Sequence, residues 1–328
     1  MLRVILEPAD EQSPPWDFED TAKSPADISL ERHGCLLLLT ARFANSVLLN
    51  TEKEKTKLSL FPDLSTILSN FLGSQPNELV EASPTALVDS LLSLAQLSSI
   101  NDSAEIDEND LKNLLLALSA CTSAPGLRSL DRVSKILETI FSHLGAPSQR
   151  YTLIQHILSD PNTQWARGAA LKCLKHELQH AISDSPFTSS TSFTSLFDPL
   201  FTIPAPLGTI PSDLSTITTD SLIEILTSLR DPHISHILLT LNLYLYLLKS
   251  EQLRARLELD TKLNDRFSEQ YLAPLKNIAR LVVEDDGAAK ILGDSVDGME
   301  QVLMNAKGAG MTLGHVIGLV EEAMEKGE

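Results

Sequence analysis

A short cluster of side chains in the middle of the chain has the composition of a zinc site. His176, Glu177 and His180 belong to the segment HELQH, in which the two histidines are one helical turn apart. In zinc peptidases this spacing aims both imidazoles at one Zn²⁺, and the glutamate activates the metal-bound water. The segment therefore raises the hypothesis of a zinc metallopeptidase, which requires the three side chains to meet inside the protein.

The helix that would carry HELQH predicts a different orientation for its histidines. At 100° per residue, Leu171, Leu174 and Leu178 form one apolar stripe. His176 and His180 then fall roughly opposite this stripe. We therefore expect both imidazoles to face water.

A third metal ligand is missing from the neighbouring sequence. The next glutamate after Glu177 is Glu224, and no histidine follows at the spacing of the metzincins. No GxSxG segment is present either. We expect a protein that is not an enzyme and binds no metal or other cofactor, with the zinc metallopeptidase as the alternative.

The surrounding elements repeat a pattern of helix, Asp-Pro turn and helix. Residues 158–161 (LSDP) correspond to residues 229–232 (LRDP), and each Asp-Pro is predicted to end one helix and begin the next. Arg167 stands where the inner helices of HEAT repeats often carry an arginine. Because one hairpin cannot cover its own apolar face, such hairpins must stack. The pattern predicts an all-α fold, an irregular HEAT-like α-solenoid of stacked helical hairpins.

The composition agrees with helices throughout. Of the 328 residues 43% are hydrophobic but only 5% aromatic, and no stretch shows the two-residue alternation of a strand. The predicted helices cover residues 28–50, 63–72, 84–98, 108–121, 129–144, 148–159, 163–182, 219–230, 232–249, 262–284, 296–306 and 312–326. We interpret the glycine-rich residues 307–314 as the end of one helix and the start of the next, because they lack the spacing of a phosphate-binding loop.

The chain is predicted to have one helical domain preceded by an arm. Residues 1–27 are acidic and rich in proline, a composition typical of a flexible segment. Residues 28–328 form the single helical domain. Within it, residues 183–219 contain sixteen Ser or Thr, five Pro and no Lys or Arg. We expect this stretch to be an excursion with one short helix around residues 193–197.

Charge and hydropathy exclude two classes of partner. The formal net charge of −18 predicts a surface that repels phosphate backbones, so nucleic-acid binding is not expected. No apolar stretch reaches the ~20 residues that a membrane span needs. The N-terminus does not have the pattern of a secretory signal, so we expect a soluble protein of the cytoplasm, the nucleus or both.

The three cysteines are far apart in the sequence. Cys35, Cys121 and Cys173 each lie in a Leu- or Ala-rich stretch and show no metal-ligand spacing. We expect buried, reduced thiols, as is usual inside cells. A redox-sensing thiol remains the alternative.

Four segments resemble the glomulin and fungal Yap-binding protein family. They are residues 150–182, 193–206 (FTSLFDPLFTIPAP), 237–251 (ILLTLNLYLYLLKSE) and 267–275 (FSEQYLAPL). The resemblance spans roughly residues 130–283, and the most distinctive element is the LNLYLYLL helix that follows a Phe- and Pro-rich excursion. Because the family pattern is longer, we expect an N-terminal portion to be absent or reduced here.

The resemblance implies a HEAT-like, non-enzymatic protein that works by binding other proteins. Animal members mask the RING subunit of cullin ubiquitin ligases, and fungal members bind a bZIP stress-response factor and are linked to kinetochores. It therefore implies a role in ubiquitin-ligase regulation or in the oxidative stress response. No functional residue transfers position by position.

The exposed side of the HELQH helix supplies the candidate contacts. They are Lys172, Lys175, His176 and Gln179. We expect a regulatory adaptor whose acidic surface binds a basic segment of a partner, with binding energy concentrated in a few buried anchors. A structural subunit of a larger assembly is a further alternative.

Overall fold

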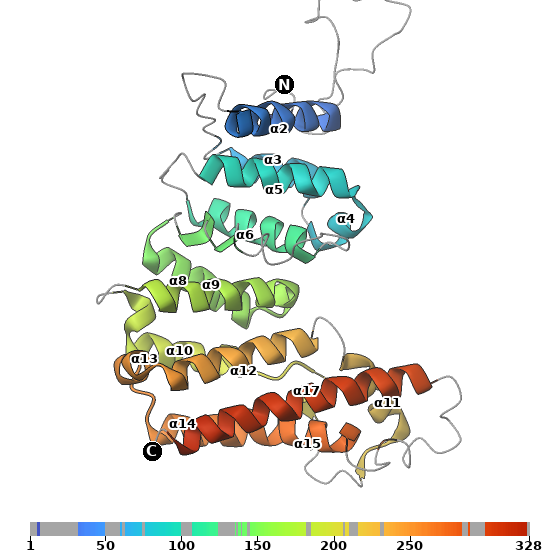
Figure 1. Cartoon of the computed structure of the whole chain (residues 1–328), viewed down its shortest axis with the longest axis vertical. Helices are drawn as coiled ribbons and strands as arrows, with labels where there is room; N and C mark the ends of the chain where they lie inside the picture. The colour runs from blue at the N-terminus through green and yellow to red at the C-terminus, as the bar shows by residue number, and fades with distance from the viewer. Residues whose placement is uncertain are drawn as a thin grey trace, which may run out of the picture. The chain divides into compact units, whose positions relative to one another are not determined.

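The described residues of the computed structural model are helical or connect helices, and none of them forms a strand (Figure 1). They are residues 5–6, 32–49, 60, 63–73, 76–99, 107–123, 135, 137–138, 140–142, 145–181, 185–205, 207–209, 216–229, 233–283, 288 and 299–326. The chain divides into two compact units, Met1–Leu153 and Ile154–Glu328, called here the N-terminal and the C-terminal unit.

Pairs of helices build the N-terminal unit. Its helices are α2 (Arg32–Leu49), α3 (Leu64–Leu72), α4 (Pro76–Ala82), α5 (Thr85–Ser99), α6 (Glu108–Ser123) and the first half of α8 (Pro147–Ser159). Helix α2 packs against α5, while α3 and α4 pack against α6. A side-chain hydrogen bond joins α3 to α6, in which the Ser65 hydroxyl donates to Asp110 Oδ1 at 2.8 Å.

The C-terminal unit consists of helices that pack against their neighbours. After α8 come η3 (Pro161–Ala166), α9 (Arg167–His180), η4 (Pro186–Thr188), α10 (Ser190–Leu200), η5 (Leu207–Thr209), α11 (Thr219–Ser228), α12 (His233–Lys249), α13 (Glu251–Arg256), α14 (Thr261–Phe267), η7 (Ser268–Leu272), α15 (Ala273–Val283) and α17 (Glu300–Glu325). Helix α12 lies between α9 and α17, and α15 packs along α17 (Figure 1).

Side-chain caps fix where several of these helices begin. In each case an oxygen of the capping side chain accepts a hydrogen bond from a backbone N–H three residues further on, which satisfies a donor that the helix itself leaves unpaired. The capping residues are Ser189, Thr218, Ser250 and Asp260. Within each unit, the helices bury leucine-rich faces against one another. The prediction of an all-α, HEAT-like α-solenoid is confirmed.

The prediction for residues 307–314 was wrong. Helix α17 runs without interruption from Glu300 to Glu325, so the two helices predicted at 296–306 and 312–326 are one. A Cβ atom on Gly310 would lie 2.2 Å from Val282 Cγ2. The absence of a side chain at Gly310 therefore allows α17 to pack closely on α15. This packing outweighs the low helix propensity of glycine, which destabilises a helix by about 1 kcal/mol relative to alanine.

Where the structure describes it, the Ser/Thr-rich stretch 183–219 contains more helix than predicted. Helix α10 covers 190–200 and not only 193–197. It buries Phe193, Leu196, Phe197 and Leu200, and spacings of three and four residues on an amphipathic face explain why it extends beyond the predicted core. The short helices α4 and α13 were not predicted.

Some predicted features fall partly or wholly outside the described residues. Residues 7–27 are among them, so the flexible arm and the single domain at 28–328 stay predictions. Ile5 and Leu6 are described, and Asn70 Nδ2 donates to both of their carbonyl oxygens, at 3.1 and 3.0 Å. Of the helix predicted at 129–144, only residues 135, 137–138 and 140–142 are described, and they are helical.

Candidate protein-binding surface

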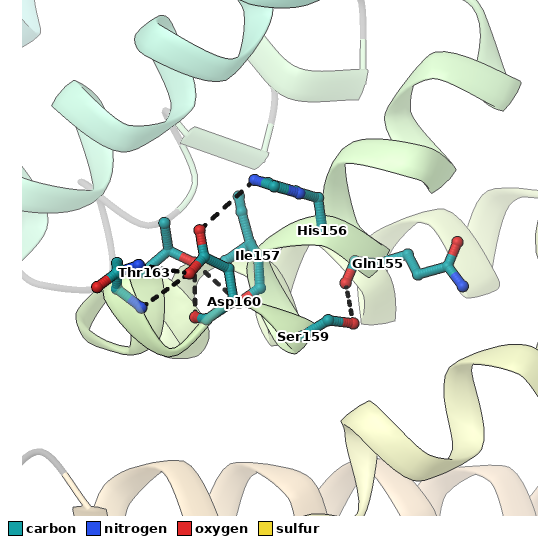
Figure 2. A network of polar contacts seen from close by, with 7 residues as sticks. Gln155, His156, Ile157, Ser159, Asp160 and Thr163 are labelled. Atoms are coloured by element: carbon teal, nitrogen blue, oxygen red, sulfur yellow. Dashed lines mark hydrogen bonds and ion pairs between the residues drawn. The ribbon is translucent and has the colours of Figure 1, made fainter.

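The Asp-Pro turn at Asp160 positions the helix that carries HELQH. An Asp160 carboxylate oxygen accepts hydrogen bonds from the backbone N–H and the side-chain amide of Asn162, at 2.9 and 3.0 Å. The Thr163 hydroxyl donates to the Ile157 carbonyl at 3.1 Å, and His156 Nε2 lies 3.7 Å from Asp160 Oδ2 (Figure 2). The turn ends α8 and starts the 3-10 helix η3, which leads into α9. In the second copy, Asp231 and Pro232 lie outside the described residues.

Arg167 locks the start of α9 to the ends of two other helices. Its guanidinium donates to the Leu158 carbonyl at 3.3 Å, to the Pro199 carbonyl at 2.9 Å and to the Leu200 carbonyl at 2.7 Å. Carbonyls at helix ends lack partners within the helix, so one buried arginine satisfies several of them. Burial lowers the pKa of the Arg167 guanidinium. The prediction of a HEAT-type arginine at this position agrees with these contacts.

Five aromatic rings pack together in the C-terminal unit. They are Phe197, Phe201, Tyr244, Phe267 and Tyr271. Tyr244 stacks on Phe267 with ring centroids 3.7 Å apart, and its hydroxyl donates to Asn264 Oδ1 at 2.6 Å. Burial raises the pKa of Tyr271 to about 12 and also raises the pKa of Tyr244. Such edge-to-face and stacked contacts make this aromatic cluster a rigid core.

This cluster contains aromatic residues from three of the segments that resemble the family. Phe197 and Phe201 belong to residues 193–206, Tyr244 to residues 237–251, and Phe267 and Tyr271 to residues 267–275. All five side chains are buried. These five residues therefore belong to the framework of the C-terminal unit, and a partner would have to bind to exposed residues.

The HELQH residues do not converge on an internal point. Glu177 is 6% exposed, whereas His180 is exposed and His176 is half-buried. The two imidazole centroids lie 4.3 Å apart, and His180 Nδ1 is 2.9 Å from the His176 carbonyl oxygen. Within the described ranges, no group of three or more His, Cys, Asp or Glu side chains is placed to hold a metal ion. This geometry gives the zinc metallopeptidase hypothesis no support.

Comparison with known families decides the relationship. The model of the family described as "Uncharacterised protein family, YAP/Alf4/glomulin" matches residues 5–299, which is most of the chain. The chain belongs to the YAP/Alf4/glomulin family. No curated protein matches it. Membership of the YAP/Alf4/glomulin family confirms the resemblance seen in the sequence, supports a protein-binding role, and is not membership of a known enzyme family.

The candidate contacts in this YAP/Alf4/glomulin protein lie along one side of α9. Lys175 and Gln179 are exposed, and Lys172 and His176 are half-buried. The ammonium of Lys175 lies 5.6 Å from the centre of the Tyr246 ring of α12, in range for a cation–π interaction. Whether these residues bind a partner stays a prediction.

Sequence reasoning missed the part of this surface that α12 supplies. Asn242 and Lys249 are exposed and Tyr246 is half-buried, at spacings of four and three residues. They interrupt an otherwise leucine-rich helix, and that interruption is the signal that could have indicated a second exposed stripe.

The three cysteines were predicted to be buried, reduced thiols. Cys35, Cys121 and Cys173 are buried and form no disulfide, as expected, and burial raises the pKa of Cys121 to about 12. No helix in the described part of the chain combines the length and the apolar character needed to cross a bilayer.

Proposed function

We propose that this member of the YAP/Alf4/glomulin family is a non-enzymatic regulatory scaffold that binds another protein through exposed residues of its inner helices. One observation carries the proposal: α9 presents Lys172, Lys175, His176 and Gln179 on the side that its buried residues leave accessible. Arg167 holds the start of this helix against the ends of α8 and α10. Stacked helices that bury their apolar faces offer an extended, preorganised surface, which lowers the entropic cost of binding.

The partner class follows from the family resemblance. We propose a bZIP stress-response factor or the RING subunit of a cullin ubiquitin ligase, so that binding would regulate the oxidative stress response or ubiquitin transfer, in the cytoplasm, the nucleus or both. A kinetochore role, also implied by the resemblance, would use the same scaffold with a different partner.

Affinity purification followed by mass spectrometry tests the proposal. The full chain is purified from cells and washed at increasing salt, and the proteins that remain are identified. A regulatory partner bound partly by charge is expected to be recovered at low salt and released as salt rises. A partner that survives every wash would instead indicate a structural subunit, and recovery of no partner would contradict the proposal.

A further inference from the structure

Two neighbouring helices of the C-terminal unit have the opposite charge balance from the rest of the chain. The sequence has 44 acidic and 26 basic residues, whereas α9 and α12 together carry four basic side chains and one acidic one. The acidic residue, Glu177, and one of the basic residues, Arg167, are buried. The charged side chains that reach solvent on these helices are therefore lysines: Lys172, Lys175 and Lys249.

One of these lysines lies over an aromatic ring, and the other two lie one helical turn away along α9 and α12. A Cβ atom on Gly168 would lie 3.2 Å from the His236 ring, and further along Lys175 lies over Tyr246. The two helices therefore run side by side in the same direction. Lys172 is one turn before Lys175 on α9, and Lys249 is one turn after Tyr246 on α12.

We call this surface the basic face. It consists of Lys172, Lys175, Gln179, Asn242, Tyr246 and Lys249. Acidic groups border it on the α17 side, where Glu322 interacts with Lys249 and forms an ion pair with Lys326. Helices α9 and α12 themselves carry no exposed carboxylate.

We propose that the basic face binds an acidic segment of the partner protein, with carboxylates beside the lysines and an apolar side chain against Tyr246. This inference rests on the proposed scaffold function and names the chemistry of its partner. It replaces, at this face, the expectation that an acidic surface binds a basic segment. Charge complementarity supports it, and a half-buried tyrosine is a common anchor at protein interfaces.

The negative net charge of the whole chain does not prevent an acidic segment from binding to the basic face. At physiological salt, charges further apart than about 8 Å are largely screened. A docked carboxylate therefore interacts mainly with the nearby lysines. The acidic remainder of the chain slows the approach of an acidic partner, so the complex is expected to gain its affinity from slow dissociation.

Fluorescence anisotropy with a defined peptide tests the inference. The probe is a fluorescein-labelled peptide of four Glu-Glu-Leu repeats, titrated with the full chain at physiological salt. The double variant Lys172→Glu/Lys175→Glu is expected to bind it at least about tenfold more weakly, because attraction becomes repulsion at two contacts. Tyr246→Ala is expected to weaken binding about threefold or more through loss of the anchor.

Lys307→Glu is the matched control, because it reverses an exposed charge on α17, outside the basic face. Its affinity for the peptide is expected to equal that of the unaltered protein. The single variants Lys175→Glu and Lys249→Glu, at exposed positions, keep the test valid if the double variant folds poorly. The inference is overturned if the peptide does not bind the unaltered protein, or if the Lys175→Glu and Lys249→Glu variants bind it with unchanged affinity.

The inference and the proposed function fail in different ways. The unaltered chain and the Lys175→Glu/Lys249→Glu variant are each purified from cells, and an identified partner is quantified in both. Loss of that partner from the variant, together with competition by the Glu-Glu-Leu peptide, supports both statements. Equal recovery overturns the inference and leaves the scaffold function intact, whereas no partner with either chain overturns the scaffold function itself.

Discussion

The guanidinium of Arg167 donates a hydrogen bond of 2.7 Å to the carbonyl oxygen of Leu200, 33 residues further along the chain. This contact joins the first residue of α9 to the last residue of α10. Phe201, the residue after Leu200, belongs to the aromatic cluster. The start of the helix that carries the candidate contacts is therefore tied to α10 next to the aromatic cluster.

Replacing Arg167 is expected to destabilise the C-terminal unit. Arg167→Ala leaves three buried or part-buried carbonyls without this donor, and we expect a loss of about 3 kcal/mol in the free energy of unfolding. Arg167→Lys is expected to lose less, because an ammonium can still donate to some of the three oxygens. Denaturant unfolding followed by Trp165 fluorescence, in a Trp16→Phe background, measures the effect.

Lys307→Ala serves as the control for that comparison. Lys307 is an exposed cation of α17, and its loss is expected to change stability by less than about 0.5 kcal/mol. Equal stability of Arg167→Ala and Lys307→Ala would mean that the buried hydrogen bonds of Arg167 contribute nothing to the fold.

Two glycines in α17 are expected to respond in opposite ways to the same substitution. Gly310→Ala places a methyl group 2.2 Å from Val282 Cγ2, and we expect a destabilisation of about 1–3 kcal/mol from overpacking. At Gly308 nothing lies within 4 Å of an added Cβ. Gly308→Ala is therefore expected to stabilise the protein by about 0.5–1 kcal/mol through helix propensity. Denaturant unfolding of both variants provides the measurement, and a gain in stability for Gly310→Ala would contradict the packing.

The buried tyrosines predict a loss of stability at high pH. Burial raises the pKa of Tyr271 to about 12, above the value of about 10 for a tyrosine in an unfolded chain. Between these pH values the unfolded state has lost a proton that the folded state keeps. The free energy of unfolding therefore falls as pH rises, by about 1.4 kcal/mol per pH unit for Tyr271, and the contribution is fully present below pH 10.

Titration of phenolate absorbance tests this directly. The chain has four tyrosines, and Tyr244 and Tyr271 are expected to ionise later than a free tyrosine, whereas all four titrate normally in denaturant. In Tyr271→Phe the slope of stability against pH above 10 should be smaller. Ionisation of all four tyrosines near pH 10 in the folded protein would contradict the burial of the cluster.

Periodicity and turn chemistry were sufficient to predict most of the helices. The helical wheel correctly indicates that Leu171, Leu174 and Leu178 are buried. Apolar residues at spacings of three and four lie on one side of a helix, and that side packs against the core. Asp160 caps the turn as its residue type predicts. Local signals of this kind act within one or two turns of the chain, so one sequence is enough to interpret them.

Features that depend on distant residues could not be predicted in the same way. The glycines of α17 indicate a helix break when taken alone, and only the contact of Gly310 with Val282 shows why the helix continues. Tyr246 becomes part of the candidate surface because α12, which begins 53 residues after α9 ends, packs beside α9. Such contacts follow from tertiary packing, which overrides local propensity.

All three thiols are expected to be unreactive in the folded protein. Cys35, Cys121 and Cys173 are buried, and the raised pKa of Cys121 keeps that sulfur protonated near neutral pH. Reaction with a thiol-specific reagent should therefore be slow before unfolding and reach three equivalents in denaturant. Rapid modification of one cysteine in the native protein would favour the redox-sensing alternative.

The exposed histidine of the HELQH segment, His180, is expected to be dispensable for folding, and the protein is expected to bind no zinc there. His180 is exposed and Glu177 is buried, and among the described residues no group of three or more His, Cys, Asp or Glu side chains is placed to hold a metal ion. Purified protein is expected to contain no stoichiometric zinc by elemental analysis, and His180→Ala is expected to keep its stability within about 0.5 kcal/mol. Glu177→Ala is the informative contrast, because truncating a buried side chain should cost more than truncating an exposed one. Stoichiometric zinc that disappears in both His176→Ala and His180→Ala would show that the two imidazoles act together as ligands.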